Sequence, residues 1–261
     1  MDPLVVATFA VVALLEIIVP LALGYWIVKK FGVSWRVFVL GALSFIVVQI
    51  VHAPLVLVTQ TPLYLAVLPF GTTAAVAVLA VYLGLLAGLF EEIGRYLVYR
   101  YIFRRQEIPL TRENGLQFGA GWGGVESMIV ALLVLTSMLS YIAVTSDGSM
   151  LFLPDDPAIQ AQVEALRALT ALEILPGLAE RMMTIVLHIA WSLMVLAAVV
   201  YGRKALLALA IIWHAAVDAA AVYLAQTQGI LVTEAAVFVF AVIALAYLFG
   251  EWRRMGVRAA T

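Results

Sequence analysis

The chain has no cysteine among its 261 residues. Disulfide bonds, a thiolate nucleophile and cysteine-ligated metal centres are therefore excluded. Charged side chains are also scarce, at 12% of the residues, whereas hydrophobic residues make up 65% and the mean hydropathy is +1.10. No soluble domain of this size has such a composition, so the chain is predicted to be a multi-pass protein integral to the cell membrane. Its net charge of -1 gives no reason to expect a nucleic-acid partner.

Seven apolar windows of about 20 residues are each long enough to cross a lipid bilayer. They lie near 4–28, 36–58, 72–99, 115–143, 178–201, 205–226 and 232–250. The first window lacks the basic start and the small-residue cleavage site of a signal peptide, so it is expected to be a retained helix. No internal repeat or low-complexity segment divides the chain. The sequence therefore predicts an all-α, polytopic membrane protein with seven transmembrane helices in a single domain, 1–261.

Basic residues collect on alternate connections between these windows. Twelve of the 15 follow the first, third, fifth and seventh windows, and they are Lys29, Lys30, Arg36, Arg100, Arg104, Arg105, Arg112, Arg203, Lys204, Arg253, Arg254 and Arg258. The other connections are mainly acidic. Because lysine and arginine favour the cytoplasmic side of a membrane, we expect the N-terminus outside the cell and the C-terminus in the cytoplasm.

The one long connection, at about 145 to 177, is expected on the outer side. Turn-forming residues occupy its first part, near 147–157. From Pro157 to Leu175, apolar residues recur at helical intervals with polar residues between them. This pattern predicts an amphipathic helix in the external loop, lying on the outer surface.

Three charged residues lie close together inside the third window, at Glu91, Glu92 and Arg95. A charged group at membrane depth costs about 3 kcal/mol on insertion scales, so these residues need partners or a water-filled cavity. On a helix, Arg95 reaches Glu91 at four residues and Glu92 at three. We expect the arginine to hold one carboxylate and to leave the other free.

Further polar residues lie in the next three windows. Glu126 follows the glycine pair Gly119 and Gly123, a spacing that lets another helix approach closely. His188 is the one histidine of the fifth window. His214 and Asp218 are one turn apart in the sixth, so the aspartate is able to orient the ring. Counted at about 1.5 Å per residue, all of them lie within two turns of the membrane midplane, which predicts one polar layer.

Three polar residues in the first two windows are interpreted as structural. Glu16, Gln49 and His52 each stand without a second motif residue. Such side chains commonly form hydrogen bonds between membrane helices. Glu16 is in addition a candidate counter-charge for Arg95.

Four motifs occur in order on four successive predicted helices. They are Glu91-Glu92-x-x-Arg95, Trp122-xxx-Glu126 after glycines, His188, and His214-xxx-Asp218. The set resembles the superfamily of CAAX prenyl endopeptidases and bacteriocin-processing membrane proteases, and most closely its YhfC and PrsW branches. The resemblance covers about 72–226, which makes this the site-bearing core. The seven-helix layout with an external N-terminus is also similar to the APH-1 subunit of gamma-secretase, a scaffold.

Two departures from the CAAX enzymes affect the residue roles. Those enzymes have Glu-Glu-x-x-x-Arg, and this chain has one residue fewer before Arg95. They also have a histidine where this chain has Glu126, so a histidine role does not transfer to that position. The glutamate form looks like PrsW.

The resemblance implies an intramembrane endopeptidase of glutamate type that acts on membrane proteins or lipidated peptides. Without a cysteine or a Ser-His pair among the motifs, a carboxylate has to activate water. In this interpretation Glu91 is the general base, and Glu92, paired with Arg95, is its orienter. His214, with Asp218 on the same face, stabilises the oxyanion. His188 and Glu126 complete the pocket around the water, and no cofactor is required.

Three alternatives remain open at this stage. Glu91, Glu126, His188 and His214 are a set that binds Zn²⁺ in metalloproteases, since two histidines and a carboxylate leave an open position. A non-catalytic scaffold similar to APH-1 needs the glycines and the buried polar groups but no base. A transporter would use the acids as a proton relay. The substrate, the cleavage site and the oligomeric state stay open.

Overall fold

The computed structural model describes residues 1–146 and 156–258, and within these residues the regular structure is entirely helical. Seven of the described helices are long and apolar enough to cross a membrane. They are α1 Pro3–Phe31, α2 Trp35–Val67, α3 Thr72–Leu97, α4 Arg112–Thr145, α6 Ala171–Val200, α7 Lys204–Thr227 and α8 Ile230–Arg258. The predicted all-α, seven-span membrane protein is confirmed.

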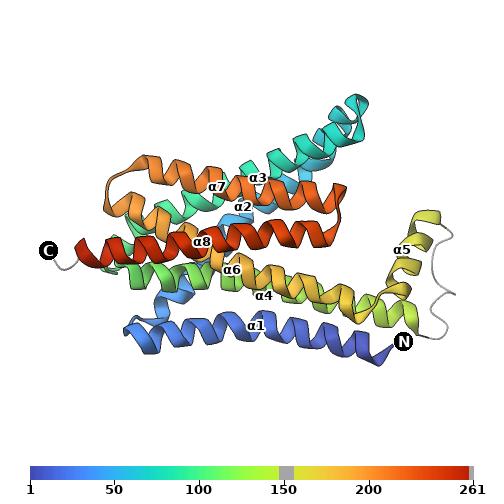
Figure 1. Ribbon diagram of the computed structural model, residues 1–261, viewed down its shortest axis with the longest axis horizontal. Coiled ribbons are helices and arrows are strands. Elements are labelled where there is room, and N and C mark those ends of the chain that lie inside the picture. The colour runs from blue at the N-terminus through green and yellow to red at the C-terminus, as the bar shows by residue number, and fades with distance from the viewer. Residues whose placement is uncertain (147–155, 259–261) are drawn as a thin grey trace.

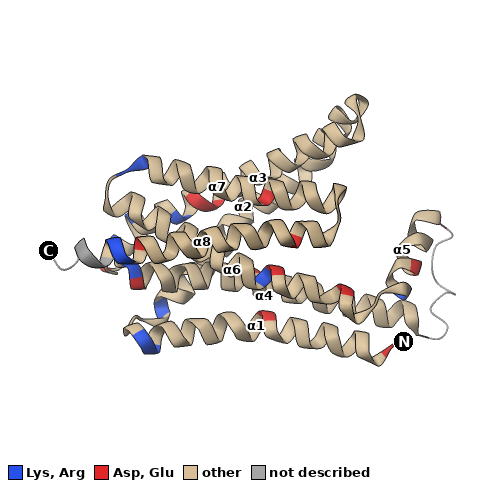
Figure 2. Ribbon diagram, in the orientation of Figure 1, with Lys and Arg blue, Asp and Glu red and all other residues tan. Residues whose placement is uncertain are grey.

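The helices lie side by side, with the two termini at opposite ends of the bundle (Figure 1). Most lysines and arginines gather at the end where the C-terminus lies, and acidic residues are distributed through the rest of the bundle (Figure 2). This segregation matches the alternation seen along the sequence. The assignment of that end to the cytoplasm remains a prediction.

Helix α2 is longer than its apolar window. It continues past position 58 to Val67, and a short 3-10 helix η1, Leu68–Phe70, then leads to Gly71. The polar residue Thr59 does not interrupt it, because its hydroxyl donates to the carbonyl of Leu55 at 2.6 Å and accepts from Tyr82 of α3 at 2.6 Å. The tips of α2 and α3 therefore project together beyond the other helices (Figure 1).

The predicted amphipathic helix is present but shorter than expected. Helix α5 spans Pro157–Ala168, and the Asp156 side chain caps it by accepting from Ala158 N at 2.7 Å. The expected continuation to Leu175 is wrong, because Thr170 and Glu173 form a capping box that starts α6 at Ala171. The turns predicted at 147–155 lie outside the described residues.

Helix α4 packs against α1, α2 and α6 through its glycines. A Cβ on Gly121 would collide with the backbone carbonyl of Phe38 in α2. A Cβ on Gly123 would lie 2.9 Å from the Cβ of His188 in α6. The close approach of backbones that the small residues predicted is thus present, and it brings α4 directly against the histidine of α6.

The topology generates a labelling prediction. Because the chain has no native cysteine, Ala158→Cys in α5 and Gln106→Cys after α3 each introduce a unique thiol, and both positions are exposed. In intact cells, a membrane-impermeant maleimide should label the cysteine at 158 and leave the one at 106 unmodified until the membrane is permeabilised. Labelling of both from the same side would contradict the span count.

Candidate active site

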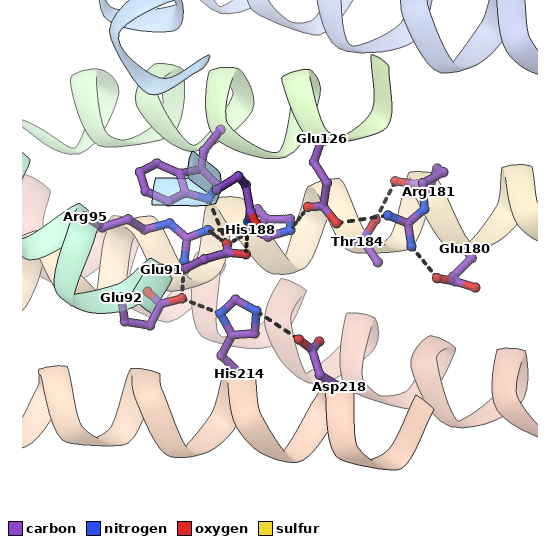
Figure 3. Close-up of polar contacts among 12 residues, drawn as sticks. Glu91, Glu92, Arg95, Glu126, Glu180, Arg181, Thr184, His188, His214 and Asp218 are labelled. Atoms are coloured by element: carbon purple, nitrogen blue, oxygen red, sulfur yellow. Dashed lines mark hydrogen bonds and ion pairs between the residues drawn. The ribbon is translucent and has the colours of Figure 1, made fainter. Parts of the chain in front are cut away.

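Helices α3, α4, α6 and α7 contribute the polar side chains of one network in the bundle (Figure 3), and α2 adds Gln49. All seven site residues that the sequence predicts lie in this network, which extends from Asp218 on α7 to Glu126 on α4. Each is linked to the next by a hydrogen bond or an ion pair. The expected polar layer is therefore one continuous set of contacts.

Arg95 is at the centre of the network and has 0% exposed surface. Its Nη1 pairs with Glu92, and its Nη2 lies 3.2 Å from Glu91 Oε2 and 2.6 Å from His188 Nδ1. The guanidinium also stacks over Trp122, 4.4 Å from the ring centroid. The expectation that one carboxylate stays free is wrong, because the forked guanidinium has enough donors to reach both.

Glu91 is held by three donors from three helices. Its Oε2 accepts from Trp122 Nε1 at 2.9 Å as well as from Arg95, and its Oε1 accepts from Gln49 Nε2 at 3.2 Å. Its side chain is 7% exposed, whereas that of Glu92 is 0% exposed. Of the two adjacent acids, Glu91 is therefore the one that retains some exposed side-chain surface.

Gln49 and His52 form a layer behind Glu91. His52 Nδ1 lies 3.1 Å from Gln49 Oε1, and its ring stacks on Phe90. The prediction that Gln49 makes an interhelical hydrogen bond is confirmed. The sequence did not indicate that its partner is Glu91, because spacing along one helix does not show which residue of the neighbouring helix it faces.

Glu92 and Asp218 lie on either side of the His214 ring. Its Nδ1 is 2.6 Å from Glu92 Oε1, and its Nε2 is 3.4 Å from Asp218 Oδ2. The ring stacks on Trp191 with centroids 3.9 Å apart, which fixes its plane. Asp218 is the most accessible member of this part of the network, with a side chain that is 36% exposed.

The hydrogen bonds of His188 assign its tautomer. Arginine only donates, so His188 Nδ1 accepts from Arg95 and carries no proton. The proton is therefore on Nε2, which contacts Glu126. The ring is neutral in this arrangement, and Glu126 is the group that holds its orientation.

Arg181 is a member of the network that the sequence analysis missed. Its Nη1 lies 3.1 Å from Glu126 Oε1, and its Nη2 pairs with Glu180 (Figure 3). A signal was present, since Arg181 stands seven residues before His188 and therefore on the same face of α6. It is also one of the three basic residues, of 15, that do not belong to the connections rich in lysine and arginine.

Glu16 does not take part in this site. Its side chain is 0% exposed, and neither carboxylate oxygen has a hydrogen-bond partner among the described residues. The suggested pairing with Arg95 is wrong, because α1 packs mainly against α4 and α6 rather than α3.

The positions of the histidine and carboxylate side chains also show whether the network fits a metal ion. Histidine and glutamate are the donor types that Zn²⁺ prefers. However, no three of the described histidine, aspartate and glutamate side chains converge on a common point as metal ligands do. The Arg95 guanidinium contacts both His188 and Glu91, two of the four candidate ligands, and both nitrogens of His214 face carboxylates. The donor types suit zinc, and their arrangement does not.

The fold and the site together define a class of protein. Its members are seven-helix membrane proteins in which buried glutamate, arginine and histidine side chains form one network. The family model described as YhfC intramembrane metalloprotease matches residues 12–242. The chain therefore belongs to the YhfC family, and the family description places it among the intramembrane proteases. The expected relation to the YhfC branch is confirmed, and that to APH-1 stays a prediction.

A relative supports this assignment. The chain is 32% identical over 229 residues to a protein of Bacillus subtilis (strain 168) named "Uncharacterized membrane protein YhfC", and the match covers 84% of each chain. No solved structure matches the chain.

The position of Arg95 generates a stability prediction. Arg95→Ala would leave two carboxylates in the bundle without their cation, so the free energy of unfolding should fall by about 3–5 kcal/mol. Arg254→Ala is the matched control, because its side chain is 79% exposed and only 3.9 Å from Glu251, and it should cost less than about 1 kcal/mol. Unfolding of the purified proteins in detergent measures both values. Equal losses would contradict a central role for Arg95.

Proposed function

We propose that the protein is an intramembrane endopeptidase in which Glu91 activates water. The observation that carries this proposal is the difference between the two acids beside Arg95. Glu92 is enclosed and contacts the Arg95 guanidinium and the His214 ring, whereas the Glu91 side chain retains some accessible surface. Its Oε1 accepts only from the neutral amide of Gln49 and so has a lone pair left for a water proton.

In the proposed reaction, Glu91 takes a proton from water while the water oxygen attacks the carbonyl carbon of the scissile peptide bond. The carboxyl group then gives that proton to the leaving amine, which leaves Glu91 ionised again. Arg95, Trp122 and Gln49 hold the carboxylate in one position throughout. This preorganisation supports the role of Glu91, because a base is effective only when its reach to the water is fixed.

His214 is the proposed donor to the oxyanion. Its Nδ1 is engaged by Glu92, so Nε2 is the nitrogen that faces the accessible side. The contact of Nε2 with Asp218 is long, at 3.4 Å, so an incoming carbonyl oxygen is able to replace it. Both ring nitrogens face carboxylates, so both carry a proton, and the imidazolium donates from Nε2 once the carbonyl oxygen has replaced Asp218. Asp218 is a positioning residue that orients the ring before the substrate binds.

His188, Glu126 and Arg181 are proposed to position the base rather than to react. Arg181 holds Glu126, the Glu126 carboxylate contacts Nε2 of His188, and His188 Nδ1 accepts from Arg95. This order of contacts keeps the guanidinium directed toward Glu91. Because the site is enclosed by helices with apolar outer surfaces, the proposed substrates are membrane proteins or lipidated peptides.

Substitution of the two adjacent acids ranks them. Glu91→Gln preserves size and hydrogen bonding but removes the base, so turnover should fall by about 10² or more with unfolding unchanged. Glu92→Gln should lower both stability and turnover, since it weakens contacts to Arg95 and His214. The control is His52→Ala, which removes a polar side chain behind Glu91 and leaves both acids unchanged.

The measurement is cleavage of a panel of membrane-protein substrates by the protein in liposomes. Full activity of Glu91→Gln together with loss in Glu92→Gln would invert the two roles. If both variants kept full activity, the scaffold interpretation would replace the catalytic one.

A zinc-dependent protease is the second candidate, and the description of the family favours it. His188, His214, Glu126 and Glu91 are the residues that would hold the ion, but the arrangement described above does not fit it. We therefore expect less than one zinc per purified protein and activity that resists a chelator. Elemental analysis beside a chelation assay checks this, and one bound zinc with activity lost to the chelator and restored by the metal would overturn the choice.

A further inference from the structure

Three arginines lie at the end of α3, away from the catalytic network. Arg100 lies within η2, a π-helical segment that spans Val98–Phe103, and Arg104 and Arg105 follow it. All three are exposed. In the part of the chain that the structure describes, none of them forms an ion pair with a carboxylate, whereas Arg112, Arg181 and Arg254 each do.

These arginines line a cavity of about 790 Å³, a size typical of ligand sites. Its other walls include the apolar side chains of Ile108, Leu110 and Val199. The lining therefore combines cationic groups with apolar and tyrosine side chains. A ligand that suits this lining has an anionic group attached to an apolar body.

Guanidinium groups bind phosphate oxygens through paired hydrogen bonds, which favours a phosphate as the anionic group. The cavity lies at the end of the bundle where most lysines and arginines gather (Figure 2). Basic pockets between membrane helices on the cytoplasmic side are suited to phospholipid headgroups. The apolar lining residues Ile108, Leu110 and Val199 then contact the glycerol and acyl part of the same lipid.

A second cavity at the same end provides a comparison. It has a volume of about 710 Å³ and is lined by Arg203, Arg253 and Arg254. Glu251 also lines it, accepts from the Tyr201 hydroxyl at 2.8 Å and lies 3.9 Å from Arg254. This carboxylate repels an anion, so the two cavities have the same number of arginines but a different affinity for phosphate.

We propose that the cavity of Arg100, Arg104 and Arg105 binds the phosphate of an anionic phospholipid. The inference is independent of the proteolytic reaction, since none of these residues contacts the catalytic network. Phosphatidylglycerol fits the site, whereas the choline ammonium of phosphatidylcholine is repelled by the arginines.

The test compares lipid retention by the full-length protein purified in detergent with equal amounts of the two lipids, measured by native mass spectrometry. The wild-type protein should retain phosphatidylglycerol in preference to phosphatidylcholine. In R100Q/R104Q/R105Q this preference should fall by about five-fold for each arginine, on the order of 100-fold in total. The matched control R203Q/R253Q/R254Q removes the same charge from the same end and should keep most of the preference.

The proposal would be overturned if the wild-type protein showed no preference for phosphatidylglycerol. It would also be overturned if the two triple variants lost this preference equally, which would show a bulk charge effect. Inorganic phosphate is added in a second arm, and its binding without any preference for phosphatidylglycerol would overturn the lipid as the source of the phosphate. If the triple variant does not fold, the three single glutamine variants are measured instead, and each should lose about five-fold.

Discussion

The buried charge of Arg95 is the constraint on which the other polar positions of the bundle depend. A guanidinium at this depth is tolerated only with counter-charges and hydrogen-bond acceptors around it. Glu91 and Glu92 supply the charges from the same helix, and His188 supplies a neutral acceptor from α6. Trp122 covers the face of the guanidinium from α4. One side chain therefore requires three helices to meet at the same depth.

This meeting also explains the packing of α4. Its glycines bring the backbone against α2 and α6, so that Trp122 reaches Glu91 and His188 reaches Arg95. Helix α6 is the most enclosed of the spans, with 72% of its apolar window buried. A helix in that central position is able to contact the polar groups of α3, α4 and α7 at once. The same geometry encloses Arg95, Glu92 and His214 almost completely, and it leaves more of the Asp218 and Glu126 side chains accessible, at 36% and 26%.

Much of this arrangement was predictable from the sequence. The spans followed from apolar length, and the relation of Arg95 to its acids and of His214 to Asp218 followed from helical spacing. The expectation that one carboxylate beside Arg95 stays free failed within a single helix, because the guanidinium reaches both acids. The other site predictions that failed depended on contacts between helices. The sequence predicts a hydrogen bond for Gln49 but not its partner Glu91, and it gives no role to Arg181. It also suggests Glu16 as a counter-charge for Arg95, although α1 does not pack against α3. The prediction of where α5 ends failed for a local reason. The capping box at Thr170 starts a new helix, although the apolar periodicity of the sequence continues through it.

The proposed role of Glu91 requires that a guanidinium, and not a metal ion, contacts both Glu91 and His188. An experimental structure of the active protein, with diffraction data collected on both sides of the zinc absorption edge, tests this most directly. The account predicts density for Arg95 in contact with Glu91, Glu92 and His188, and no anomalous peak among them. A zinc peak bound by His188 and His214, with Arg95 moved away from both, would contradict it.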